Sequence, residues 1–240
     1  MTDETSSLRA PTAPLADPLP GHATGGPAAV LWDMDGTLVD TEPFWMRAET
    51  ELVTTHGGTW TKAHAETLVG MDLLVAAEEI RRVGGVDIDP VDIVNMMMER
   101  VIELMADEPP WQPGALDLLT GLRAEGIPCV LVTMSWRRLA GAVVDLLPPG
   151  TFADLVVGDE VARGKPHPDP YIEAARRLGV DPRDCIAIED SPIGAASARA
   201  AGCTVLGVPH AVDVPASSVD ALVPSLAGVD VTELRRLATR

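Results

Sequence analysis

Five short apolar runs, each ending at a loop-forming segment, limit what this chain can fold into. They lie at 28–32, 128–132, 155–157, 185–188 and 204–208, and their length and composition are typical of strands buried on both faces. Helical patterns lie between them, at 115–125, 136–147, 169–178 and 192–201, several followed by glycine. This alternation predicts an α/β fold with a parallel sheet.

Residues 43–108 interrupt the alternation, because they contain successive helical patterns and no clear buried strand. Helices are expected from Pro43 to about Thr55, from an Asp72 cap to about Val83, and from Asp89-Pro90 to about Met105. The methionines at 96–98 fall mid-helix, where methionine more often fills core gaps than binds a ligand. The segment is therefore predicted to be an inserted helical domain joined to the core by two linkers, which would form a hinge.

The first 27 residues differ from both regions. They carry five prolines and no apolar period, which is typical of a disordered tail. The sequence thus predicts a tail at 1–27, a core made of 28–42 and 109–240, and a helical insert at 43–108.

Net charge and cysteine use exclude several classes of partner. The formal charge of −18 opposes binding to nucleic acid or to anionic membranes, and no apolar run reaches the roughly 20 residues that span a bilayer. The N-terminus lacks the basic and apolar regions of a secretory signal. Three cysteines without metal-type spacing (Cys129, Cys185 and Cys203) indicate buried free thiols and a cytoplasmic protein.

Polar residues follow the predicted strands at the sheet edge where ligands bind in open α/β folds. The first run ends in Asp33-Met34-Asp35-Gly36, the second in Thr133-Met134-Ser135 and the fourth in Glu189-Asp190-Ser191, while Gly164-Lys165-Pro166 follows the third. Four carboxylates at one edge repel one another, by about 4 kcal/mol for each pair ~4 Å apart at an effective dielectric constant of 20. A magnesium ion and Lys165 would offset that charge, and the oxygen-only donor set disfavours zinc.

The two aspartates of the first loop are suited to different chemical roles. Asp33, at the strand end, is placed to attack phosphorus, and Asp35 could protonate the leaving oxygen and later activate water. Taken alone, an Asp-x-Asp-Gly stretch is better explained by an ordinary turn. Lys165 could be a solvated surface lysine, but a lysine at a Gly-Lys-Pro turn, in a chain that uses arginine almost everywhere else, favours a functional role. The combination of loops in this order favours the catalytic interpretation.

Together these motifs resemble those of the haloacid dehalogenase superfamily. The stretch from Asp33 to Pro43 resembles its motif I, Thr133 motif II, Lys165 motif III and the Glu189–Gly194 stretch motif IV. The resemblance covers about residues 28–210. It implies a Rossmann-like catalytic core, and the helical insert is similar to the C1-type cap of the β-phosphoglucomutase-like branch.

The resemblance also implies roles for individual residues. Asp33 would be the nucleophile and Asp35 the general acid and base, with Thr133 and Lys165 binding the transferred phosphoryl group. Magnesium would be held by Asp190, Glu189, a side-chain oxygen of Asp33 and the backbone carbonyl of Asp35. The second aspartate, Asp35, disfavours dehalogenation, because the dehalogenases of the superfamily lack it.

Substrate-contacting residues are expected both in the core and in the insert. They are Ser135 in the core, and Trp45, Gly70 and Asp72 in the insert. Trp45 could instead belong to the insert's core, and Asp72 could be only a helix cap.

Departures from the mutase pattern decide among the functions that the resemblance allows. Trp45 stands where β-phosphoglucomutases carry a histidine, and the 69–73 loop has no basic residue for a second phosphate. The sequence therefore predicts a magnesium-dependent phosphatase that hydrolyses a small, sugar phosphate-like monoester through an aspartyl-phosphate. The alternatives are a phosphosugar mutase and a non-catalytic binding protein on the same fold. The sequence leaves monomer or homodimer undecided.

Overall fold

The computed structural model describes residues 26–68, 71–107 and 109–239. The predicted disordered tail at 1–27 lies outside this range, apart from Gly26 and Pro27. None of the helices described is long and apolar enough to cross a membrane.

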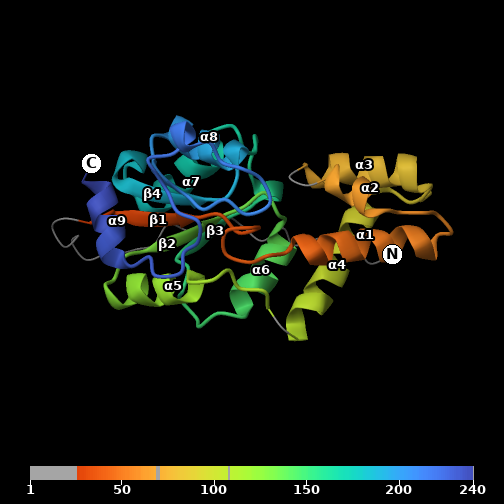
Figure 1. Cartoon of the computed structure of the whole chain (residues 1–240), viewed down its shortest axis with the longest axis horizontal. Helices are drawn as coiled ribbons and strands as arrows, with labels where there is room; N and C mark the ends of the chain where they lie inside the picture. Colours follow the sequence, from red (N-terminus) through yellow and green to blue (C-terminus); the bar gives the residue numbers. More distant parts are fainter. Residues whose placement is uncertain (1–25, 69–70, 108, 240) are drawn as a thin grey trace, which may run out of the picture.

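The predicted strands form one parallel sheet, with a sixth short strand at its edge (Figure 1). The strands are β1 (Ala29–Trp32), β2 (Cys129–Val132), β3 (Asp154–Val156), β4 (Cys185–Glu189), β5 (Thr204–Gly207) and β6 (Ala221–Leu222). Their order is β3-β2-β1-β4-β5-β6, which places β1 between β2 and β4. The sequence did not predict β6, because two residues are too few for a recognisable apolar run.

Helices cover both faces of this sheet, which confirms the predicted α/β fold. The core helices are α5 (Ala115–Ala124), α6 (Arg137–Asp145), α7 (Asp169–Leu178), α8 (Pro192–Ala201) and α9 (Val231–Ala238). Short 3-10 turns occupy Gly158–Glu160, Pro182–Asp184 and Ala216–Ser218. Alternate strand residues point to opposite faces, so Leu31 packs in the cluster under α7 and α8, and Trp32 in the cluster on the other face.

The described part of the insert contains four helices, one more than the sequence predicts for the same segment. They are α1 (Glu42–Thr55), α2 (Lys62–Glu66), α3 (Leu73–Gly84) and α4 (Pro90–Asp107). The five-residue helix α2 is too short to show a period, and its Thr61 capping box is the local signal for it. The boundaries at 43 and 108, and the hinge, remain predictions.

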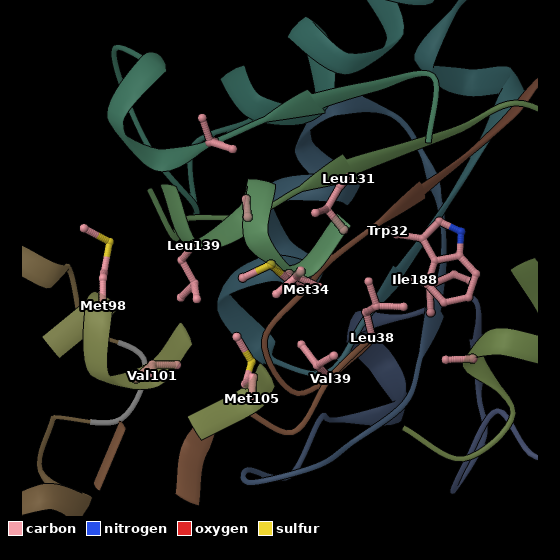
Figure 2. Packing of buried hydrophobic residues seen from close by; sticks show 14 of the residues in the cluster. Trp32, Met34, Leu38, Val39, Met98, Val101, Met105, Leu131, Leu139 and Ile188 are labelled. Atoms are coloured by element: carbon pink, nitrogen blue, oxygen red, sulfur yellow. The ribbon is translucent and has the colours of Figure 1, made fainter. Parts of the chain in front are cut away.

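Helix α4 carries the apolar contact between insert and core (Figure 2). Its Met98, Val101 and Met105 are buried in one cluster with Leu139 of α6 and Val39 of the first linker. The prediction that the methionine run fills core gaps is correct for the buried Met97 and Met98 and wrong for Met96, which is 43% exposed. A helix has two faces, and Met96 lies on the outer one.

The two segments that link the insert to the core, 38–40 before it and 110–112 after it, are hydrogen-bonded to each other. Val39 forms an antiparallel bridge with Trp111, the Asp40 amide donates to the Pro110 carbonyl at 2.8 Å, and the Gln112 amide donates to the Leu38 carbonyl at 2.9 Å. The chain therefore enters and leaves the insert at the same place, directly beyond the end of β1.

Candidate active site

The candidate active site is built at the carboxyl ends of three adjacent strands. Asp33 follows β1, Thr133 follows β2, and Glu189 is the last residue of β4. Because the strand order is β2-β1-β4, these ends are neighbours although they are far apart in sequence. The loop after β3 adds Lys165, so the polar residues predicted from the strand ends do meet at one edge.

Lys165 links the nucleophile candidate to the acidic end of β4. Its ammonium donates to Asp33 Oδ1 and to Glu189 Oε1, both at 2.6 Å, and to the Val132 carbonyl at 2.9 Å. The lysine side chain is only 6% exposed. Burial lowers the pKa of Lys165, but Asp33 and Glu189 outweigh that effect and hold it above the usual range. Lys165 therefore stays charged, and the alternative of a surface lysine is wrong.

Asp35 is surrounded by hydroxyl groups. Oδ1 accepts from Thr41 Oγ1 at 2.5 Å, and Oδ2 accepts from Ser135 Oγ at 2.8 Å and from Thr133 Oγ1 at 3.2 Å. Burial raises the pKa of Asp35, which the hydroxyls partly oppose. A raised pKa favours a carboxyl group that can hold a proton and give it up in a reaction.

Asp33, Glu189 and Asp190 form the acidic cluster of the site. Each offers a carboxylate oxygen, and these oxygens all lie within 4.8 Å of one another. Burial, and next the charge of Asp33, raises the pKa of Asp190 to about 9. Asp33 Oδ2 is buried without a hydrogen-bond partner among the described residues. An oxygen-only donor set with an unpartnered carboxylate oxygen fits a hard cation such as Mg²⁺.

Backbone shape at Gly36 makes this cluster possible. Gly36 has φ +88°, and a Cβ there would lie 2.1 Å from Asp190 Oδ2. A side chain at this position would therefore displace Asp190. The loop after β1 thus turns directly against the acidic cluster.

Several residues at the site were not singled out as site residues from the sequence. Thr41 holds Asp35, and the hydroxyl of Thr37 is buried without a partner among the described residues. Met134 accepts the Lys165 backbone N–H on its sulfur at 3.2 Å and packs against Gly164. Tyr171, on α7, donates to Glu189 at 2.6 Å. Met134 and Tyr171 act through contacts distant in sequence, which a local motif does not reveal. Thr37 and Thr41 lie within the motif I stretch, but the sequence does not show which of its hydroxyls are buried at the site.

The insert residues predicted to contact substrate either have a structural role or lie outside the described residues. Trp45 is half-buried and packs against the apolar cluster that continues from the core. Asp72 is exposed, and its Oδ1 accepts from the Leu74 and Val75 amides at 2.9 and 3.2 Å, so it caps α3. Gly70 lies outside the described residues. Glu42, at the start of α1, has its pKa raised to about 7 by burial and then by the nearby Asp35.

Comparison with known proteins identifies the family. The model of the haloacid dehalogenase-like hydrolases matches residues 27–202. The chain belongs to this family. It is 33% identical over 208 residues to hexitol phosphatase A of Escherichia coli, covering 85% of this chain and 93% of that protein. It is also 33% identical over 192 residues to the protein CbbY of Rhodobacter capsulatus, covering 75% of this chain and 85% of that protein.

Solved structures of the haloacid dehalogenase-like family share the fold. CbbY from Rhodobacter sphaeroides, solved with xylulose-(1,5)bisphosphate, superposes with a TM-score of 0.78 at 28% identity, over 87% of this chain and 99% of that one. A β-phosphoglucomutase from Clostridium difficile gives 0.74 at 20% identity, over 88% and 97%, a likeness of fold alone. The Rossmann-like fold, the superfamily and the enzyme class, a phosphoric monoester hydrolase, are thereby confirmed.

Proposed function

We propose that this chain is a magnesium-dependent phosphatase that hydrolyses a small sugar or polyol phosphate through an aspartyl-phosphate on Asp33. The observation that carries the proposal is the state of Asp33. One carboxylate oxygen is ion-paired with Lys165, and the other is buried without a partner among the described residues. Such an oxygen is available to attack phosphorus or to bind a cation.

In the first step, Asp33 attacks phosphorus and the bond to the leaving oxygen breaks. Protonated Asp35 gives its proton to that oxygen, so the alcohol leaves neutral. Lys165 stabilises the negative charge on the phosphoryl group, with Thr133 as a further donor.

In the second step, water attacks phosphorus as Asp35 takes its proton, and the bond from phosphorus to Asp33 breaks. Inorganic phosphate and the free carboxylate of Asp33 result. A bound Mg²⁺, held by Asp33, Asp190 and Glu189 with the Asp35 carbonyl, would neutralise charge on the phosphoryl oxygens. Ser135 contributes by holding Asp35.

Charge in the insert favours a substrate with a single phosphate. Each arginine and lysine in the described part of the insert is paired with a carboxylate of the insert; these residues are Arg47, Lys62, Arg81, Arg82 and Arg100. A mutase must also bind the second phosphate of a bisphosphate intermediate, for which free cations are needed. Hexitol phosphatase A and the fructose-1-phosphate phosphatase YqaB, which is 30% identical over 182 residues, support a sugar or polyol phosphate.

The proposal extends to the cellular compartment and the binding partner of the enzyme. The three free cysteines are buried, as expected for a protein of the reducing cytoplasm. A net charge of −18 opposes binding to nucleic acid, so we expect the partner to be a small phosphomonoester alone.

Hydrolysis of an aryl phosphate, measured with Mg²⁺ and with EDTA, tests the reaction. We expect turnover only with Mg²⁺, and none above background for Asp33→Asn at unchanged thermal stability. Magnesium-dependent hydrolysis by Asp33→Asn would rule out Asp33 as nucleophile. A panel of hexose, hexitol and bisphosphate substrates then defines the class, and release of an isomeric sugar phosphate instead of free phosphate would identify a mutase.

A further inference from the structure

Tyr171 is the only tyrosine of the chain, and it lies directly beneath the candidate active site. It is fully buried on α7, in the apolar cluster that includes Leu31 and Val132. Its hydroxyl donates to Glu189 Oε1 at 2.6 Å. A fully buried hydroxyl in an apolar cluster that reaches the catalytic edge of the sheet has a directed role beyond filling space.

The same carboxylate oxygen also receives the catalytic lysine. Glu189 Oε1 accepts from Lys165 Nζ at 2.6 Å, and that ammonium lies 5.3 Å from the centre of the Tyr171 ring. Tyr171 therefore contacts both partners of the ion pair, through its hydroxyl and through its ring. Burial raises the pKa of Tyr171 well above its usual value, so the hydroxyl remains a donor.

The other carboxylate oxygen of Glu189, Oε2, faces Ser191 and Gly194. Ser191 Oγ donates to Oε2 at 3.3 Å, and a Cβ at Gly194 would lie 1.9 Å from Oε2 and 2.0 Å from Oε1. Oε1 accepts from two donors at 2.6 Å, whereas Oε2 accepts from one at 3.3 Å, so Oε2 is the oxygen more available to a cation. The orientation of the carboxylate thus depends on what holds Oε1.

We propose that Tyr171 is a positioning residue, which fixes Glu189 so that Oε2 faces the metal site and Lys165 stays directed at Asp33. The inference rests on the proposed function, in which Glu189 and Asp190 bind Mg²⁺. Outer residues that orient metal ligands in this way typically change metal affinity or activity by about 10- to 100-fold when they are replaced.

Tyr171→Phe tests the hydroxyl while keeping the ring. We expect Mn²⁺ binding, measured by electron paramagnetic resonance of the free ion, to weaken by about tenfold, and the Mg²⁺ concentration for half-maximal activity to rise by a similar factor. Val205→Ala, in the same apolar cluster, is the control, because it destabilises the core at a residue that pairs with Ala187 of β4 and not with Glu189. Mn²⁺ affinity within twofold of wild type in folded Tyr171→Phe overturns the proposal.

A second measurement leaves the sequence intact. Because Tyr171 is the only tyrosine, 3-fluorotyrosine labelling gives one ¹⁹F resonance that reports on this contact. We expect Mg²⁺ to shift this resonance in wild type and not in Asp190→Asn. A resonance unaffected by saturating Mg²⁺ overturns the proposal even where Tyr171→Phe fails to fold. Both binding readouts are independent of turnover, so activity in Asp33→Asn would refute the nucleophile without deciding the role of Tyr171.

Discussion

The core and the insert differ in whether their charged and polar side chains are buried. At the sheet edge, the buried Asp33 and Glu189 both accept from Lys165, and the buried Thr133 donates to Asp35. In the described part of the insert, Glu49 is the buried charged residue, and the arginine pairs lie at the surface. Burying charge is costly unless it is paired. The core buries charged groups at the candidate active site, whereas the insert is held together by apolar packing.

Replacing Lys165, the buried cation of the candidate site, is expected to have the largest effect. Lys165→Met should lower kcat by at least about 100-fold, because the phosphoryl charge loses its fixed partner. It should also destabilise the fold by about 3–5 kcal/mol at neutral pH, since Asp33 and Glu189 would be left buried without a cation. Steady-state kinetics and urea unfolding measure the two effects.

The chain offers a matched control for that variant. Lys62 is the other lysine, and its side chain is 79% exposed in an i, i+4 pair with Glu66. Lys62→Met should change stability by no more than about 0.5 kcal/mol and leave kcat unaltered. Equal behaviour of the two variants would contradict the contrast between core and insert.

Glu49 is the exception within the insert, and its effect should depend on pH. It is buried on α1 and accepts from Trp60 Nε1 at 3.0 Å, and burial raises its pKa to about 7. The folded state then binds more protons than the unfolded state between the ordinary glutamate pKa of 4.5 and about 7, so stability falls as pH rises through that window. Above it, the cost reaches up to about 3 kcal/mol.

Glu49→Gln should remove this dependence. Urea unfolding should show the variant gaining stability relative to wild type as pH rises from about 5 to about 8. Glu51→Gln is the control on the same helix, because Arg100 and Arg47 lower the pKa of Glu51 to about 2 and it stays ionised over this range. A pH-independent difference for Glu49→Gln would show that Glu49 is not buried as a titrating acid.

Trp45 tests whether the insert selects the substrate. Trp45→Ala should change the ratio of kcat/KM between a sugar phosphate and an aryl phosphate by up to about tenfold, while the Mg²⁺ requirement stays constant. Competition assays measure the ratio directly. An unchanged ratio would assign Trp45 to packing alone.

The smallest effect is expected at Asp72. Asp72→Ala should cost about 1 kcal/mol of stability, because α3 loses its cap, and Asp72→Asn should retain most of it. Neither should alter KM. A raised KM for Asp72→Asn at wild-type stability would restore the substrate-binding role predicted from sequence.

Elements with strong local signals were predictable from the sequence. The runs at 128–132 and 185–188 were apolar enough to be identified as buried strands, and Asp72 and Pro90 marked the starts of α3 and α4. By contrast, α2 and β6 are too short to show a period. The pairing of β2, β1 and β4 follows from tertiary packing and has no local signature.

The residues of the candidate site likewise divide into those with a local sequence signal and those without one. Asp33, Asp35, Lys165 and Asp190 stand in motifs at strand ends, so local sequence was sufficient to select them. Tyr171 lies in a helix that was predicted correctly, but its contact with Glu189 joins two elements that only the fold brings together. Thr41 lies six residues from Asp35 in the same stretch and was missed because the sequence does not show which hydroxyl faces that carboxylate.

The pairing of the two linkers has a consequence for how such enzymes can diversify. Since Leu38 and Gln112 are hydrogen-bonded, a short turn is long enough to join them, and the order of the sheet would be unchanged. The insert could therefore be replaced or removed without interrupting the sheet. In the proposed reaction, such a replacement would change which alcohol leaves, while the same core residues would bind the phosphoryl group.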